Sequence, residues 1–216
     1  MRIGIIGGSG MAGRALYREA VKRGDVPTAI VRDADKAEGV LGDYGNYLAK
    51  NARTLTASDL AAFDVIVDAL RPATPDAVQH LAVAKHLVSL ARTMPDAPRL
   101  VFVLDAGSLR TGEGRTQLDD LYDTPGTASW IAQSEQQARQ LAFLRTVDDV
   151  DWVAVSTAAQ FVAGPAGRPV LGGDDLPVGP GGASRLSSGT LAVAVLDEIH
   201  APAHRRVRIS VRDEEC

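Results

Sequence analysis

The segment GGSGMAG, residues 7–13, decides the fold of this chain. The apolar run IGIIG at residues 3–7 leads into it, and a run of helical period at residues 11–23 follows it. A second apolar run, TAIV at residues 28–31, completes a strand–turn–helix–strand unit of about 30 residues. In such a unit the helix start presents unpaired N–H groups and a positive dipole end, which favour a bound phosphate. The segment therefore predicts a phosphate-binding turn on a parallel sheet.

The glycines of this segment fit two spacings. Gly8, Gly10 and Gly13 match G-x-G-x-x-G, and Gly7 in place of Gly8 gives G-x-x-G-x-x-G. Glycine is needed in such a turn because a Cβ would block the chain or hold a pyrophosphate away from it. Ser9 can donate its hydroxyl to a phosphate. A tight turn without a ligand is the alternative, but the surrounding unit favours a dinucleotide.

The rest of the chain repeats the same alternation of apolar and helical runs. Further strands are expected at 47–50, 64–70, 99–107, 151–156 and 206–211, and further helices at 35–41, 76–92, 128–145 and 188–200. A short helix is expected after Thr56, which precedes Asp59 at the spacing of a capping box. Alternating strands and helices indicate crossovers and a parallel sheet. We predict one doubly wound, Rossmann-like α/β domain over residues 1–216.

Two segments depart from this alternation. Residues 108–127 are polar and glycine-containing and are expected to form a loop, and residues 163–185, rich in glycine and proline, are expected to form a small substrate-side cap. The last strand, RVRISV at 206–211, alternates polar and apolar residues, which indicates one wet face. It is either an exposed edge that pairs in a homodimer or an edge protected by its arginines.

Composition excludes several classes of protein. The 216 residues carry a net charge of −4, with 45% hydrophobic and 23% charged residues, so nucleic acid and anionic membranes are not expected partners. The single cysteine, Cys216, offers no internal disulfide, which suits a reducing compartment. No apolar run approaches the roughly 20 residues that span a bilayer. We expect a soluble, cytoplasmic protein that contains no metal site.

The residue after the second expected strand is Arg32. A carboxylate at this point accepts hydrogen bonds from a ribose 2′-hydroxyl and selects NAD. A guanidinium instead clamps a 2′-phosphate with paired donors. We therefore predict NADP(H) as the cofactor, with NAD(H) as the alternative, because the adjacent Asp33 could neutralise Arg32 or bind the ribose itself. A surface arginine without a ligand is the remaining interpretation.

Seven stretches taken in order carry a family resemblance. They are IGIIGGSGMAG, TAIVR, LTASDLAAFDVIVDAL, RLVFVLDAGSL, DVDWVAVSTAAQF, LGGD and VLDEIHAPAHRR, and they span nearly the whole chain. The chain resembles the atypical short-chain dehydrogenase/reductase proteins of the NAD(P)H-binding, NmrA-like group, in particular the small bacterial NADH-flavin reductases. The resemblance implies a Rossmann domain with a small cap.

The resemblance also implies roles for single residues. The pyrophosphate would be held by Gly7, Ser9, Gly10 and Met11, with Gly13 packing the helix on the sheet. Arg32 would meet the adenosine ribose or its phosphate. The cofactor would further be lined by Ala69, Leu70 and Arg71, its nicotinamide flanked by Ala106, Gly107 and Ser108, and its far side closed by Ser156, Thr157 and Ala158.

The chain departs from the wider superfamily in its catalytic helix. The Tyr-x-x-x-Lys pattern is missing: Trp130 or Ile131 lies where the tyrosine is expected, and no lysine follows Lys85. Tyr122 lies upstream without a lysine partner. Carbonyl reduction or sugar-nucleotide epimerisation by that pair is therefore disfavoured. The chain also reads LDAGSL where the family has GGAGSL, so Asp105 is either a cap of the turn or a carboxylate of another purpose.

A site without a strong acid suits a flavin-like or quinone-like hydride acceptor, because the protein then supplies mainly orientation and exclusion of water. Ser108 is the candidate for a catalytic polar contact, with a turn cap as the alternative. Tyr122, Trp130 and Phe161 are candidates for a wall of the substrate pocket, with ordinary packing as the alternative. A non-catalytic NADP(H) sensor is the second hypothesis, and a relative whose ligand site has drifted is the third.

Overall fold

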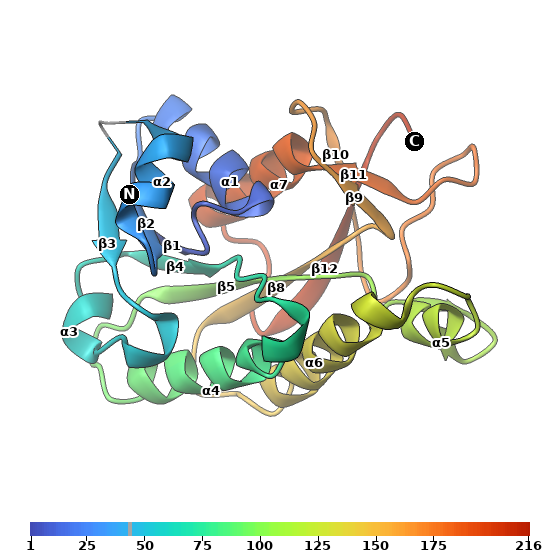
Figure 1. Cartoon of the computed structure of the whole chain (residues 1–216), viewed down its shortest axis with the longest axis horizontal. Coiled ribbons are helices and arrows are strands. Elements are labelled where there is room, and N and C mark those ends of the chain that lie inside the picture. The colour runs from blue at the N-terminus through green and yellow to red at the C-terminus, as the bar shows by residue number, and fades with distance from the viewer. Residues whose placement is uncertain (43–44) are drawn as a thin grey trace.

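A central sheet of eight strands lies between two layers of helices (Figure 1). The computed structural model describes residues 1–42 and 45–216. Every neighbouring pair in this sheet is parallel except β10 and β12. In spatial order the strands are β10 (Pro169–Gly172), β12 (Val207–Asp213), β8 (Trp152–Thr157), β5 (Arg99–Leu104), β4 (Val65–Asp68), β1 (Arg2–Ile6), β2 (Val26–Val31) and β3 (Tyr47–Ala49). The predicted doubly wound α/β fold is confirmed.

Each face of the sheet carries its own helices. The layer drawn above the sheet in Figure 1 consists of α1 (Met11–Lys22), α2 (Ala34–Leu41) and α7 (Ser188–His200). The layer below consists of α3 (Ala57–Leu60), α4 (Gln79–Ala91) and α6 (Ala128–Leu144), together with the 3₁₀ turns η1 (Ala52–Thr54) and η2 (Thr74–Asp76). Because both faces are covered, the inner strands read as continuous apolar runs.

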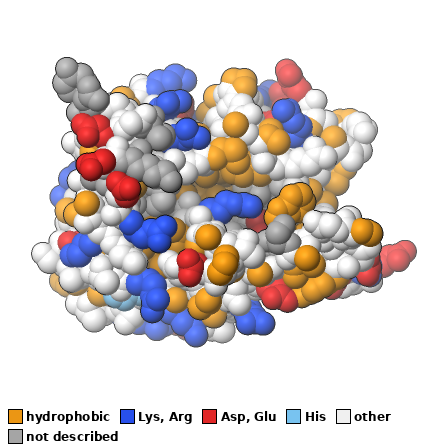
Figure 2. All heavy atoms as spheres, in the orientation of Figure 1, with side chains coloured by type: hydrophobic (Ala, Val, Ile, Leu, Met, Phe, Trp, Pro, Cys, Tyr) orange, Lys and Arg blue, Asp and Glu red, His pale blue; other side chains and the backbone are white. Residues whose placement is uncertain are grey.

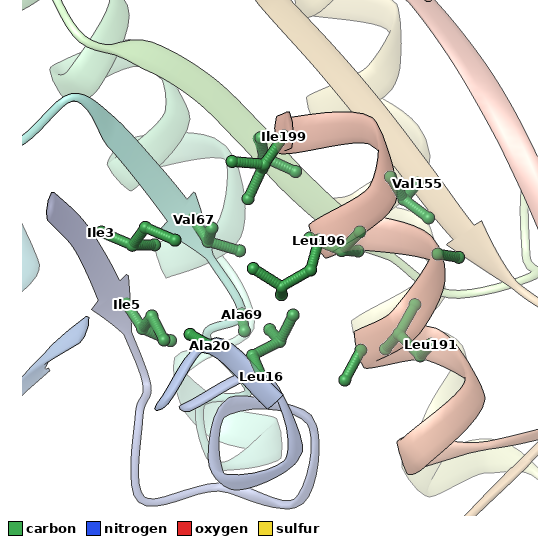
Figure 3. Packing of buried hydrophobic residues seen from close by; sticks show 14 of the residues in the cluster. Ile3, Ile5, Leu16, Ala20, Val67, Ala69, Val155, Leu191, Leu196 and Ile199 are labelled. Atoms are coloured by element: carbon green, nitrogen blue, oxygen red, sulfur yellow. The ribbon is translucent and has the colours of Figure 1, made fainter. Parts of the chain in front are cut away.

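Two hydrophobic clusters fill the spaces between the sheet and these layers. In the upper cluster Leu16 and Ala20 of α1 face Leu191 and Leu196 of α7, next to Ile5 of β1 (Figure 3). The lower cluster packs α4 and α6 against the opposite face of the same strands. The alternation of side chains along each strand therefore divides one apolar run between two cores.

Local capping signals explain where the helices α3, α7 and α5 (Gln117–Tyr122) begin. Thr56 and Asp59 form the predicted capping box, and Ser187 caps α7 by accepting a hydrogen bond from the Thr190 N–H. The polar segment 108–127 holds more structure than predicted: the short strands β6 (Arg110–Gly112) and β7 (Arg115–Thr116) and the helix α5. A second capping box, Thr116 with Asp119, opens α5. Its T-x-x-D spacing is the readable signal that our prediction missed.

The prediction for the last strand is wrong in two respects. β12 is an inner strand between β8 and β10, and its polar residues Arg208 and Ser210 are 6% and 0% exposed. The reason is tertiary, because residues 174–175 cover that face and Asp174 pairs with Arg208.

The expected cap at 163–185 contributes β10, the edge strand of the main sheet, and β11 (Arg185–Ser187), which pairs with β9 (Gln160–Val162) in a small second sheet. Among the described helices, none combines the length and the apolar character that crossing a membrane requires.

Candidate functional site

Four turns meet at one edge of the sheet. Because β1, β4, β5 and β8 are parallel neighbours, the residues that follow them, 7–13, 69–71, 105–109 and 158, lie at their shared carboxyl edge. The connections leave β1 and β4 toward opposite sides, and ligands of open α/β sheets bind where this reversal occurs. The surface is hollowed at this edge, between the upper layer and α5 and α6 below (Figure 2).

The glycine turn forms a cradle that side chains would fill. Gly7 has a φ of +74°, and a Cβ on Gly7 would lie 2.8 Å from the Ala69 oxygen. A Cβ on Gly13 would lie 2.2 Å from the Gly7 oxygen, so α1 can approach the turn this closely only with glycine there. Gly10 is the N-cap of α1 and supplies no side-chain cap. The helix start therefore keeps its donors for a ligand, which fits the pyrophosphate of a dinucleotide.

Uncompensated cations border this cradle. Arg32 follows β2 and Arg71 follows β4, and both side chains are exposed. Neither has an ion pair or side-chain hydrogen bond within the part of the chain that the structure describes. Most other arginines are paired, as Arg2 is with Asp64 and Arg92 with Asp149. The free charges at this edge suit a ligand with several phosphates.

The turn after β5 is held by α6. The Asp105 carboxylate accepts hydrogen bonds from the Gly107 N–H at 2.9 Å and from the Ser134 hydroxyl at 2.6 Å. The Asp105 N–H donates to the Gln137 side chain. A Cβ on Gly107 would lie 2.7 Å from the Ser134 Cβ, so the turn rests directly on α6. Asp105 therefore caps the turn, which is the first of the two roles that the sequence left open.

A buried arginine braces the same turn from the other side. The Arg208 guanidinium donates to the Ser108 hydroxyl at 3.2 Å and to the Ser156 hydroxyl at 3.4 Å. It also contacts the Asp174 carboxylate at 2.5 Å, and the side chain of Arg208 is 1% exposed. Burial lowers the pKa of Arg208, and the Asp174 carboxylate opposes this shift. Ser108 and Ser156 are thus brought together by a residue that sequence reasoning did not select.

Asp68 is a second residue that the sequence did not single out. It ends β4 directly before Ala69, and it is 3% exposed. Its carboxylate accepts a hydrogen bond from the Leu70 N–H at 3.1 Å and a long one from the Gln140 side chain at 3.5 Å. Burial raises the pKa of Asp68 to about 7, and these two hydrogen bonds offset only part of that effect. This buried carboxyl group therefore lies directly before residues 69–71, which the sequence predicted to line the cofactor.

Polar side chains of α6 connect these groups. Gln133, Ser134, Gln137 and Gln140 are all buried and lie on one face of the helix. Gln133 is 2.7 Å from the Nε2 atom of buried His80 and donates to the Pro72 oxygen at 2.8 Å. Sequence reasoning missed this stripe because glutamines at helical spacing are typical of an exposed face.

The remaining predicted site residues have different surroundings. Ala106, Thr157 and Ala158 are buried, whereas Ser9 and Met11 are half-buried at the turn. Trp130 and Tyr122 are 56% and 54% exposed on α6 and α5. Phe161 lies on β9 in the upper layer and packs against the upper core. The three aromatic residues therefore lie on three different elements, α5, α6 and β9.

Together, the parallel sheet, the glycine cradle and the free cations define a Rossmann-like nucleotide-binding protein. The sequence model of the NAD(P)H-binding family matches residues 7–199. The chain belongs to this family, whose members bind a nicotinamide cofactor.

Individual relatives match the chain over nearly its whole length. The uncharacterized Bacillus subtilis protein YwnB is 36% identical and is aligned over 99% of both chains. A crystal structure of a Lactobacillus casei protein superposes with a TM-score of 0.89, at 36% identity over 99% of both chains. The structure of a "putative NADH-flavin reductase" from Streptococcus pneumoniae superposes with a TM-score of 0.86, at 30% identity over 99% of both chains.

Proposed function

We propose that this protein is an NADPH-dependent reductase that delivers hydride to a flavin-like or quinone-like acceptor. The observation that carries the proposal is the glycine cradle beside Arg32, which has no ion pair among the residues that the structure describes. The relative described as an NADH-flavin reductase supports the acceptor class. When bound, the reduced nicotinamide supplies the hydride, so the chain itself needs no redox group.

The residues of the chain bind the cofactor, orient it toward the acceptor and exclude water from the site. The backbone of residues 7–11 holds the pyrophosphate, and Arg32 pairs with the 2′-phosphate. The turn at 106–108 lies against the nicotinamide, with the Ser108 hydroxyl fixed by Arg208. Arg208 can donate to Ser108, which leaves the Ser108 proton free to contact an acceptor. Ser108 thus provides a polar contact without acting as a strong acid.

The missing tyrosine and lysine favour a second candidate function. Trp130 and Ser134 stand four residues apart on α6, and neither supplies the acid of a carbonyl reductase. A protein that binds NADP(H) tightly without turnover would report the redox state to a partner. This sensor function differs from the reductase in one measurable property, which is the oxidation of NADPH.

The deciding experiment measures NADPH oxidation, followed by loss of nicotinamide absorbance, with FMN, riboflavin and a small quinone as acceptors. Turnover with any of these acceptors supports the reductase. Tight NADPH binding without turnover supports the sensor and contradicts the reductase. Absence of binding to both NADPH and NADH contradicts both functions.

The preference for NADPH has its own test in the substitution Arg32→Glu. Losing the guanidinium and adding a like charge beside a 2′-phosphate should weaken NADPH binding by about 1–3 kcal/mol. NADH binding should change much less. Calorimetric titration of both nucleotides measures the two effects, and Arg53→Glu, at an exposed arginine on η1, is the matched control. Equal effects on NADPH and NADH would exclude the 2′-phosphate contact.

A further inference from the structure

A second concave region lies on the outside of the upper helix layer. It is a groove of about 370 Å³ that is lined by α1, α7 and the segment that follows β9. From α1 it is lined by three cations and one carboxylate, Arg14, Arg18, Lys22 and Glu19, together with Met11 and Ala15. Opposite them lie Ala163, Gly164 and Ala166 and the first residues of α7. The groove is therefore cationic on one wall and formed mostly by small residues on the other.

Two of its cations have no partner. Arg14 is half-buried and Arg18 is exposed, and neither has an ion pair or side-chain hydrogen bond within residues 1–42 and 45–216. Lys22 differs, because Glu19 lies 3.4 Å from its ammonium group. Glu19 also accepts a hydrogen bond from Arg23 at 2.8 Å, so it is not free to neutralise the groove. The two guanidinium groups are left uncompensated.

The spacing of these arginines is unfavourable for the helix alone. Arg14, Arg18 and Lys22 are four residues apart in turn, so like charges stand one above the other on α1. Like charges at this spacing destabilise a helix. A half-buried guanidinium without an acceptor adds a desolvation cost. Both costs disappear if an anion occupies the groove.

The opposite wall of the groove is formed by small, uncharged residues. A Cβ on Gly189 would lie 2.3 Å from the Ala166 nitrogen, so the loop presses directly on the start of α7. The first donors of α7 are already used, because the Gly189 N–H donates to the Gly164 oxygen and the Thr190 N–H donates to Ser187. An anion in this groove would therefore be held by the arginines and not by the helix end.

The groove adjoins the cofactor site. Met11 begins α1 beside the glycine cradle and also lines the groove, and Ala163 follows directly on β9, the strand that succeeds Ala158. Because Met11 begins α1 beside the glycine turn, a ligand with one end at Arg14 can extend past Met11 toward the carboxyl edge of the sheet. Because the groove and the cofactor site adjoin, we favour the phosphate group of an acceptor molecule as the occupant of the groove over an unrelated anion.

We infer that Arg14 and Arg18 bind the phosphate monoester of a phosphorylated acceptor, such as FMN, whose ring lies at the nicotinamide. The inference rests on the proposed reductase function and specifies its substrate class. A guanidinium pair four residues apart matches a phosphate, because each presents several donors to different oxygens. Riboflavin has the same ring without the phosphate and is therefore the natural comparison.

The test measures the binding of FMN and riboflavin to the protein saturated with NADP⁺, by quenching of flavin fluorescence. FMN should bind about tenfold more tightly than riboflavin, as expected for charged hydrogen bonds. Arg14→Gln and Arg18→Gln should each remove most of this difference without changing riboflavin binding. Inorganic phosphate should compete with FMN and not with riboflavin. Arg53→Gln is the control for loss of one exposed arginine charge.

Three results would overturn the inference. These are equal binding of FMN and riboflavin by the unmodified protein, no flavin binding at all, or an Arg14→Gln variant that loses NADPH affinity instead. The last result would assign the groove to the cofactor. Because binding is read with oxidised cofactor, it is independent of turnover. Phosphate-dependent FMN binding without NADPH oxidation contradicts only the reductase, whereas turnover with equal KM for both flavins contradicts only the groove.

Discussion

The turn after β1, residues 7–13, and the turn after β5, residues 105–109, face the same edge of the sheet but are stabilised differently. The first depends on close backbone packing, with the Gly10 N–H donating to the Gly7 oxygen at 2.9 Å and Gly13 directly under the same oxygen. The second depends on side chains from distant parts of the chain, since it is fixed by Ser134 and by Arg208. A turn made from backbone contacts is visible in local sequence, and one made from side-chain contacts is not.

The two turns also differ in charge. At the second turn, the Asp105 carboxylate is hydrogen-bonded and the Arg208 guanidinium is neutralised by Asp174. Partial burial by itself would raise the pKa of Asp174. The hydrogen bond from Arg208 and its charge outweigh this effect, so the pKa is lowered. Beside the first turn, Arg32 and Arg71 have no acidic partner in the described part of the chain. The first turn is therefore suited to hold an anion, and the second to keep its shape around one.

The largest effect is expected from breaking the first turn with Gly13→Val. The new side chain would collide with the Gly7 oxygen, which is backbone and cannot move aside cheaply. We expect a loss of more than about 3 kcal/mol in the free energy of unfolding, together with loss of nucleotide binding. Urea unfolding and NADPH titration measure both.

Gly39→Ala is the control for this change, because Gly39 lies in α2 with open space at its Cβ position. The free energy of unfolding of the control should rise by about 0.5–1 kcal/mol, because alanine has a higher helix propensity than glycine. A Gly13→Val protein as stable as the unmodified chain would contradict the close approach of α1 to the turn.

A somewhat smaller effect is expected from breaking the second turn with Arg208→Met. The substitution leaves Ser108 and Ser156 without their donor and leaves Asp174 without its partner. Because the side chain of Asp174 is 40% exposed, water can solvate part of the released charge. We expect a loss of about 2–3 kcal/mol in the free energy of unfolding.

The matched control is Arg110→Met, which breaks the exposed pair of Arg110 with Asp175. Exposed ion pairs contribute little to stability because water screens them, so this variant should unfold nearly as the unmodified protein does. Equal losses in the two variants would mean that burial of Arg208 has no energetic consequence.

Asp68, which ends the strand between these two turns, sharpens the comparison through pH. Its pKa of about 7 in the folded protein lies above the unfolded value of 3.8, so the folded protein retains the proton over a wider pH range. Stability therefore falls as pH rises from about 4 through 7. Asp68→Asn removes this loss. We expect the free energy of unfolding of the variant to be about 2 kcal/mol higher than that of the unmodified protein at pH 8, and equal to it at about pH 4. Urea unfolding at both pH values measures it, and a pH-independent loss in the variant would contradict the buried charge.

Much of the fold was predictable because its signals are local. Alternating apolar and helical runs predicted the parallel sheet, and Thr56 predicted a helix start that the structure confirms. The edge strand β10 was not predictable in the same way. Its residues lie in a glycine-rich and proline-rich segment, and their pairing partner is β12, some 40 residues later in the chain.

The sequence by itself determined the glycine cradle, the nucleotide class of ligand and the layered sheet. Each of these depends on backbone sterics or on a period of two or 3.6 residues, which neighbouring residues encode. Only the tertiary structure decided that Asp68 would be buried, that α6 would turn its glutamines inward, and that Arg208 would brace Ser108 across 100 positions. The physical reason is that the charge state of a buried group depends on the groups packed around it, and here those groups lie far away in the sequence.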